Sequence, residues 1–139
     1  MNLTETLLLD AGVWVAAKDS SDRYFDVARA LVLDSARGLA ALDLTLYETA
    51  NVVGARWRQP EVAKELSRTI AARCGEHLLP VDTALVSSAL DVVVEHGLTA
   101  YDAAYVAAAR RHGWTLVSTD VADLVSRGLA VAPDAADYP

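Results

Sequence analysis

The chain has 139 residues and a hydrophobic content of 53%, which is enough to bury a core and excludes a disordered or low-complexity protein. No segment reaches the roughly 18 consecutive apolar residues of a membrane span, and the single cysteine, Cys74, excludes an internal disulfide and a zinc site of the usual kind. The net charge of −7 argues against a generally basic nucleic-acid-binding surface, and the lone thiol fits a reducing compartment, so we expect a cytoplasmic protein of one domain, residues 1–139.

Short apolar segments of strand length alternate with longer segments of helical periodicity. The predicted elements are, in chain order, a strand at 6–10, a helix at 20–38, a strand at 39–43, helices at 44–58 and 60–75, a strand at 77–81, helices at 82–97 and 99–113, a strand at 114–118, a short helix at 120–128 and a weak strand at 129–133. Residues 134–139 are expected to form a loose tail. Alternation of this kind indicates a parallel sheet between two layers of helices. We therefore expect a three-layer α/β/α fold with a mostly parallel sheet of about five strands.

An aspartate ends four of the predicted strands: Asp10, Asp43, Asp82 and Asp120. Asp43 and Asp82 each precede a helix, so we expect them to be helix N-caps. Asp10 and Asp120 follow the two longest apolar strands, which we expect to be neighbours in the centre of the sheet. Sites in parallel sheets form at the carboxyl ends of strands, and two buried carboxylates placed there repel each other unless a cation lies between them.

Two further acids, Glu48 and Asp102, lie within predicted helices in largely apolar surroundings. Thr99 and Asp102 together resemble a capping box, which would place Asp102 in the first turn of its helix. Asp123 is a fifth acid close by in sequence, and we expect it to be a solvated carboxylate of a first helical turn. As a set, Asp10, Glu48, Asp102 and Asp120 offer the hard oxygen ligands that Mg²⁺ or Mn²⁺ prefers, and such a centre suits phosphodiester hydrolysis.

Four segments carry a resemblance to a known family: LLLDAGVWVAA, LYETANVV, LTAYDAAYVAAAR and TLVSTDVADL. In this order and at these separations they resemble the PIN-domain ribonucleases, and most closely the VapC-type toxins of bacterial toxin–antitoxin pairs. The resemblance implies that Asp10, Glu48, Asp102 and Asp120 form an acidic quartet that binds Mg²⁺ or Mn²⁺ and cleaves RNA. It also implies that Ser118 orients groups around the metal.

The same resemblance implies partners. Such toxins are typically homodimers, and a VapB-like antitoxin inhibits them by placing its tail in a groove. The negative net charge is compatible with RNA binding, because arginines are needed only at the rim of the pocket. The candidates for the groove or the dimer face, with ordinary core packing as the alternative, are Trp14, Val52, Val53 and Trp57.

Gly12 departs from the family pattern, which commonly has serine, threonine or asparagine two residues after the first aspartate. The sequence therefore lacks one side-chain contact near the metal, which a backbone amide or a water would have to replace. A second interpretation stays open: a PIN-like domain whose acids serve only as structural caps and which acts as a binding or scaffolding module.

Overall fold

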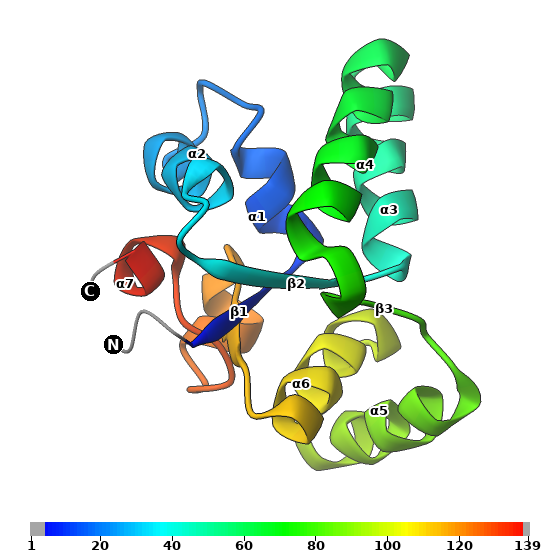
Figure 1. Ribbon diagram of the computed structural model, residues 1–139. Helices are drawn as coiled ribbons and strands as arrows, with labels where there is room; N and C mark the ends of the chain where they lie inside the picture. Colours follow the sequence, from blue (N-terminus) through cyan, green and yellow to red (C-terminus); the bar gives the residue numbers. More distant parts are fainter. Residues whose placement is uncertain (1–4, 138–139) are drawn as a thin grey trace.

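The first strand, β1 (Thr6–Leu9), lies inside a parallel sheet in the computed structural model, which describes residues 5–137 (Figure 1). Its neighbours are β2 (Gly38–Leu42) on one side and β4 (Thr115–Val117) on the other, and β3 (Leu78–Leu79) extends the sheet beyond β2. The order is β3-β2-β1-β4, and every pairing is parallel. All strands therefore end at the same edge of the sheet.

Helices cover both faces of this sheet (Figure 1). On one face lie α1 (Ala11–Ala16), α2 (Phe25–Leu33), α4 (Pro60–Cys74) and α7 (Pro133–Asp137). On the other face lie α5 (Thr83–His96) and α6 (Ala100–His112). The remaining elements are α3 (Leu44–Thr49), the π-helix η1 (Ala50–Arg56), the 3₁₀ turn η2 (Gly75–His77) and the π-helix η3 (Val121–Val125). The expected three-layer α/β/α architecture is confirmed.

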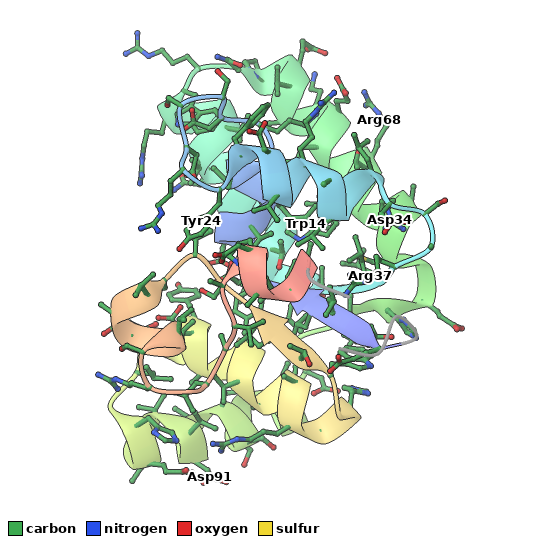
Figure 2. The ribbon with its side chains drawn as sticks, turned by 90° about the vertical axis from the view of Figure 1, so that its left-hand side faces the viewer. Trp14, Tyr24, Asp34, Arg37, Arg68 and Asp91 are labelled. Atoms are coloured by element: carbon green, nitrogen blue, oxygen red, sulfur yellow. The ribbon has the colours of Figure 1, made fainter. Side chains whose placement is uncertain are left out.

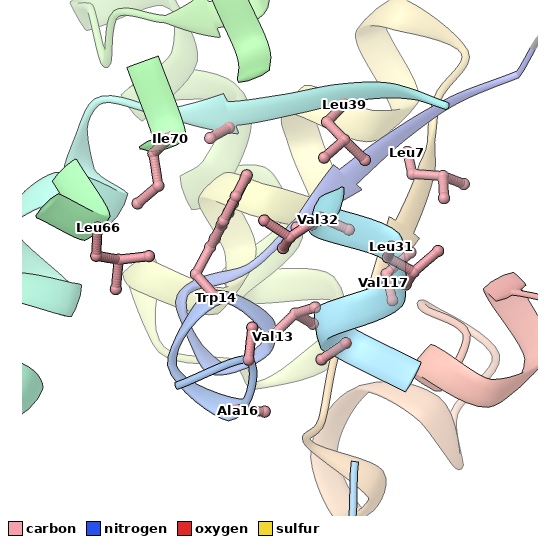
Figure 3. Close-up of a cluster of buried hydrophobic side chains, with 14 of the residues drawn as sticks. Leu7, Val13, Trp14, Ala16, Leu31, Val32, Leu39, Leu66, Ile70 and Val117 are labelled. Carbon is pink, nitrogen blue, oxygen red and sulfur yellow. The ribbon is translucent and has the colours of Figure 1, made fainter. Parts of the chain in front are cut away.

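The three leucines of β1 are buried on both faces of the sheet. Leu7 and Leu9 pack into the core beneath α1, α2 and α4, whereas Leu8 points to the opposite core beneath α5 and α6. This is the period-2 alternation of a strand whose two faces are both covered. Trp14 of α1 fills the centre of the first core beside Leu66 (Figure 3).

The C-terminal part of the chain differs from the sequence prediction in two places. The weak strand expected at 129–133 is reduced to one parallel bridge between Val131 and Val117, so four named strands remain. The loose tail expected at 134–139 is wrong up to residue 137, because α7 forms there. Its Ala136 is fully buried, and the main-chain oxygen of Ala136 accepts a hydrogen bond of 3.1 Å from the Arg37 guanidinium (Figure 2). Residues 138 and 139 lie outside the described part.

The helix predicted at 44–58 is continuous, but its second half is the π-helix η1. Gly54 of η1 faces Ala63 of α4 so closely that a β-carbon at Gly54 would lie 3.2 Å from the Ala63 side chain. A short helix, α1, also forms at residues that the sequence left without an assignment. Within residues 5–137, no helix is long and apolar enough to cross a lipid bilayer.

Candidate metal centre

Asp10 lies directly after β1, at the edge where the parallel strands end. Its N–H donates to the Val117 carbonyl at 3.1 Å, which continues the pairing of β1 with β4 by one residue. Its carboxylate Oδ1 accepts from the Val13 N–H at 3.2 Å, so Asp10 is the N-cap of α1. The residue is buried, with 8% of its surface exposed. Capping and burial fix this carboxylate at the strand edge.

Ser118 connects Asp10 to Asp120. The fully buried Ser118 hydroxyl accepts from the Asp120 N–H at 2.9 Å and donates to the Asp10 carboxylate. One hydroxyl therefore ties the end of β4 to the end of β1. The strands that carry Asp10 and Asp120 are neighbours, as predicted, because β1 pairs with β4. β4 is the outermost named strand on its side of the sheet, however, and not a central one as expected.

Three aspartates form a second part of the site. Asp120 caps η3 by accepting from the Asp123 N–H at 3.0 Å, and Asp102 occupies the first turn of α6, where the Thr99 hydroxyl accepts from its N–H at 3.2 Å. Carboxylate oxygens of Asp102, Asp120 and Asp123 all lie within 4.8 Å of one another. Asp123 is exposed, as expected, but its carboxylate belongs to this group and not to an isolated solvated turn.

Glu48 approaches the same region from α3. Its Oε1 accepts a hydrogen bond of 2.6 Å from the Tyr105 hydroxyl of α6. The Tyr105 hydroxyl also lies 2.6 Å from the Thr45 hydroxyl, one turn before Glu48 on α3. Sequence reasoning missed Tyr105 and Thr45, although the position of Tyr105 three residues after Asp102 puts both on one face of α6.

The site is a group of crowded carboxylates, and burial raises the pKa of three of them. Burial raises the pKa of Asp10 to about 7, with the hydrogen bonds from Ser118 and Val13 opposing and the charges of Asp102 and Glu48 adding to the increase. Burial also raises the pKa of Glu48 and of Asp102, and neighbouring acids add to both. Because a divalent cation would relieve this repulsion, and because every candidate ligand is a hard carboxylate oxygen, the residues present fit Mg²⁺ or Mn²⁺. All four sequence-predicted acids therefore converge here, together with Asp123.

The structure also tests the roles that the sequence predicts for several other residues. Asp82 is the N-cap of α5, since its carboxylate accepts from the Leu85 N–H at 2.8 Å. Asp43 does not cap α3: its carboxylate accepts instead from the Val81 N–H at 3.1 Å, across to the chain that follows β3. Trp14 and Val53 are fully buried in the core, so they do not form an open groove or dimer face.

Gly12 has a neighbour that explains its lack of a side chain. A β-carbon at Gly12 would overlap the Thr119 hydroxyl oxygen and would lie 3.4 Å from Oδ1 of Asp10. The Thr119 hydroxyl thus occupies the space beside Asp10 into which a side chain at position 12 would extend.

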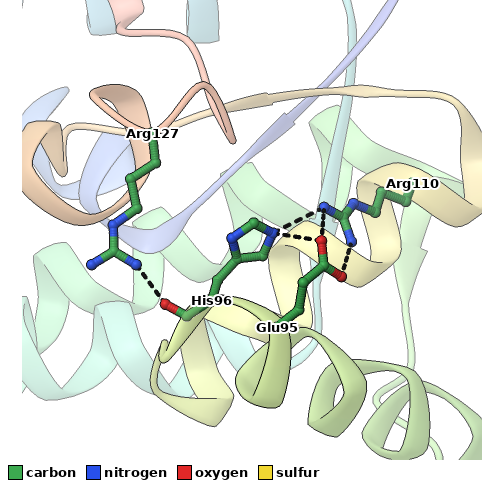
Figure 4. A network of polar contacts seen from close by, with 4 residues as sticks. All are labelled: Glu95, His96, Arg110 and Arg127. Atoms are coloured by element: carbon green, nitrogen blue, oxygen red, sulfur yellow. Dashed lines mark hydrogen bonds and ion pairs between the residues drawn. The ribbon is translucent and has the colours of Figure 1, made fainter.

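Arg127 is a cation beside this acidic group. Its guanidinium donates to the His96 carbonyl at 2.6 Å (Figure 4). The same guanidinium lies 3.7 Å from Oδ1 of Asp123. The neighbouring Arg110 is paired with Glu95 and does not reach the acids through any contact in the described structure (Figure 4). The site therefore has one basic side chain in contact with its acidic edge.

A family model for the PIN domain matches residues 7–123, which include every acid described above. The chain belongs to the PIN domain family. No curated protein sequence matches this PIN domain significantly.

Solved structures with the same fold include toxin–antitoxin proteins. PAE2754 from Pyrobaculum aerophilum is 25% identical with a TM-score of 0.70, over 97% of this PIN domain and 88% of that chain. VapC20 from Mycobacterium tuberculosis, described as a sarcin–ricin-loop-cleaving toxin, is 19% identical with a TM-score of 0.71, over 88% and 95%. A toxin–antitoxin complex from Klebsiella pneumoniae contains a chain 18% identical with a TM-score of 0.68, over 91% and 97%.

Proposed function

We propose that this PIN domain is a cytoplasmic, metal-dependent endoribonuclease toxin that hydrolyses phosphodiester bonds of RNA and that a VapB-like antitoxin neutralises. The observation that carries the proposal is the convergence of Asp10, Glu48, Asp102, Asp120 and Asp123 at the carboxyl ends of β1 and β4. A structural role as helix caps does not require five acids to share one edge. Burial and the neighbouring acids raise the pKa values of Asp10, Glu48 and Asp102, which supports a cation at this edge.

The side chains divide the work of such a site. Mg²⁺ or Mn²⁺ would be held by Asp10, Asp102 and Asp120. Glu48 would join them directly or through water, and Asp123 would extend the ligand set toward solvent. When bound, the divalent cation supplies Lewis-acid activation of the attacking water and stabilises negative charge on the phosphodiester. Ser118 holds the Asp10 carboxylate in place by its hydrogen bond. The buried surroundings of Asp10 keep bulk water from screening these charges.

Arg127 supports a polyanionic substrate. Its guanidinium lies at the edge of the acidic group, where the RNA backbone would pass on its way to the metal. The hydrogen bond to the His96 carbonyl already restricts the Arg127 side chain. Binding of RNA to this guanidinium would therefore cost little additional side-chain entropy. The structural similarity to VapC20, a sarcin–ricin-loop-cleaving toxin, supports an RNA substrate for this chain.

The proposed partner is an antitoxin, bound to a homodimer of this chain. A groove of about 480 Å³ runs between α3–η1 and α4, and its apolar lining includes Leu46, Tyr47, Ala50 and Pro60. An apolar segment of an antitoxin tail fits such a groove. The toxin–antitoxin complex from Klebsiella pneumoniae among the structural neighbours supports this partner.

The experiment that tests the proposal is cleavage of total RNA by antitoxin-free protein in Mg²⁺ or Mn²⁺, against the same reaction in EDTA. An Asp10→Asn variant, shown to be folded, serves as the control, and the new RNA ends are mapped. Discrete metal-dependent cuts that the variant does not make are expected. Absence of cuts in either metal would contradict the proposal and favour the binding-module interpretation.

A further inference from the structure

Tyr105 joins two parts of the acidic site from inside the protein. The residue is 2% exposed, and its ring packs in the core beneath α5 and α6. Its hydroxyl emerges from that core between Glu48 and Thr45, at 2.6 Å from an oxygen of each. Three residues before it on α6 lies Asp102. Tyr105 therefore connects the helix that carries Glu48 with the helix that carries Asp102.

The donors and acceptors in this chain of bonds have a defined direction. An ionised Glu48 carboxylate only accepts, so the Tyr105 hydroxyl must donate its proton to Glu48 Oε1. The Thr45 hydroxyl must then donate to Tyr105. Both protons point toward Glu48, and successive bonds of one direction polarise and strengthen each other. The arrangement favours the ionised carboxylate.

The need of the buried Tyr105 hydroxyl for a hydrogen-bond partner does not by itself explain its bond to Glu48. Thr45 alone would provide Tyr105 with a hydrogen-bond partner, at no electrostatic cost. Instead the hydroxyl also fixes Oε1 of Glu48, a side chain with three rotatable bonds that is only partly buried. The bond leaves Oε2 available for a metal ion. Thr45 is fully buried and Tyr105 nearly so, so the surrounding core restricts the positions of both hydroxyls.

We propose that Tyr105, supported by Thr45, is a positioning residue that holds Glu48 in the geometry for metal binding. The inference rests on the proposed function, since it presupposes a divalent cation at the acids. Tyr105 touches neither metal nor substrate and acts through Glu48. Loss of a hydrogen-bond partner behind a metal ligand typically weakens metal affinity by about 10- to 100-fold.

The test is the Mn²⁺ affinity of the full chain, measured by calorimetric titration. Tyr105→Phe removes only the hydroxyl, and its Mn²⁺ dissociation constant is expected to rise by about 10-fold. Thr45→Val, which is isosteric, is expected to give a smaller increase, whereas Thr45→Ser keeps the hydroxyl and should behave like the wild type. Thermal unfolding in EDTA identifies any variant that is unfolded, and the Thr45 pair tests the proposal if Tyr105→Phe does not fold.

A double variant distinguishes a specific effect of Tyr105 on Glu48 from a general loss of order in the site. In a Glu48→Gln background, Tyr105→Phe should cause no further loss of Mn²⁺ affinity, because its effect passes through the Glu48 carboxylate. Equal losses in both backgrounds, or wild-type affinity of Tyr105→Phe, would overturn the inference while leaving the proposed function intact. No Mn²⁺ binding by the folded wild type would overturn both.

Discussion

Asp10 is a buried carboxylate whose pKa lies near 7 in the folded, metal-free protein, against an ordinary value of 3.8. The folded state therefore holds a proton that the unfolded state has already lost between these values. The stability that this proton provides is complete below pH 4 and disappears as the pH rises through about 7. A divalent cation bound at the proposed site would take the place of this proton.

Asp10→Asn is consequently expected to stabilise the metal-free protein at high pH. In EDTA at pH 8 the variant should unfold with a free energy on the order of 4 kcal/mol higher than the wild type, and at pH 4 the two should be nearly equal. The asparagine oxygen keeps the bonds from Val13 and Ser118. Urea unfolding at both pH values measures the difference. A variant less stable than the wild type at pH 8 would show that Asp10 has a charged structural role.

Gly12 and Thr119 provide a second test at the scale of single residues. Gly12→Ala should cost about 1 kcal/mol in the wild type, because the new β-carbon displaces the Thr119 hydroxyl. In a Thr119→Ala background that overlap is gone, and the same change should stabilise by about 0.5 kcal/mol, since alanine is the better residue within helix α1. Urea unfolding of the four proteins gives the coupling. Equal effects of Gly12→Ala in both backgrounds would mean that the two positions do not interact.

The individual acids were more predictable than their contacts. Asp10 and Asp120 stand out because each follows an apolar strand, and parallel strands end at one edge. The hydrogen bond from Tyr105 to Glu48 spans 57 positions in sequence and depends on how α3 and α6 pack, so no local pattern predicts it. Asp43 likewise has the sequence environment of a cap, but its carboxylate accepts from the Val81 N–H in the chain segment that follows β3.

At the scale of elements, the N-termini of α5 and α6 form a matched pair. Asp82 caps α5 and Thr99 caps α6, each with one hydrogen bond to a backbone N–H. Only the cap of α6 orients a turn that carries a site residue, since Thr99 binds the N–H of Asp102 itself. A comparison of variants at the two caps can therefore distinguish an effect on helix stability from an effect on the position of Asp102.

Asp82→Ala and Thr99→Ala should each lower the free energy of unfolding by about 1 kcal/mol. Only Thr99→Ala should weaken Mn²⁺ binding, by roughly 3-fold as the Asp102 turn frays. Thermal unfolding and calorimetric titration of both variants measure the two effects. An equal loss of Mn²⁺ affinity in Asp82→Ala would indicate that metal binding reports global stability and not the position of Asp102.

Helices and strands could be predicted from the sequence where a pattern of neighbouring residues determines them. Alternating apolar strands and capped, periodic helices predict the three layers. The π-helical character of η1 and η3 has no sequence period of its own, because it arises where the helix adjusts to its neighbours. The helix α7 is short and gains its order from Arg37 and the core, so its composition alone indicates a loose tail.

At the scale of the whole molecule, a net charge of −7 must be reconciled with RNA binding. Arg127 lies at the edge of the acidic site, and Arg111 lies near the opposite end of α6 from Asp102. Arg127→Ala should weaken RNA binding by about 5-fold at low salt, because it removes one phosphate contact near the metal. Arg111→Ala removes the same charge and should leave affinity almost unchanged. Fluorescence anisotropy with a labelled RNA in Ca²⁺ measures both, and equal losses would show that only net charge matters.

We propose that the acids at the ends of β1 and β4 form the catalytic metal centre. The most direct test of this proposal is the rate of RNA cleavage in Mn²⁺ by Asp102→Asn, compared with Asp91→Asn. Both variants remove one negative charge, but Asp91 is an exposed residue on the outer side of α5 (Figure 2). We expect Asp102→Asn to lose activity by about 100-fold or more and Asp91→Asn to cleave at the wild-type rate. Wild-type cleavage by a folded Asp102→Asn protein would contradict the account.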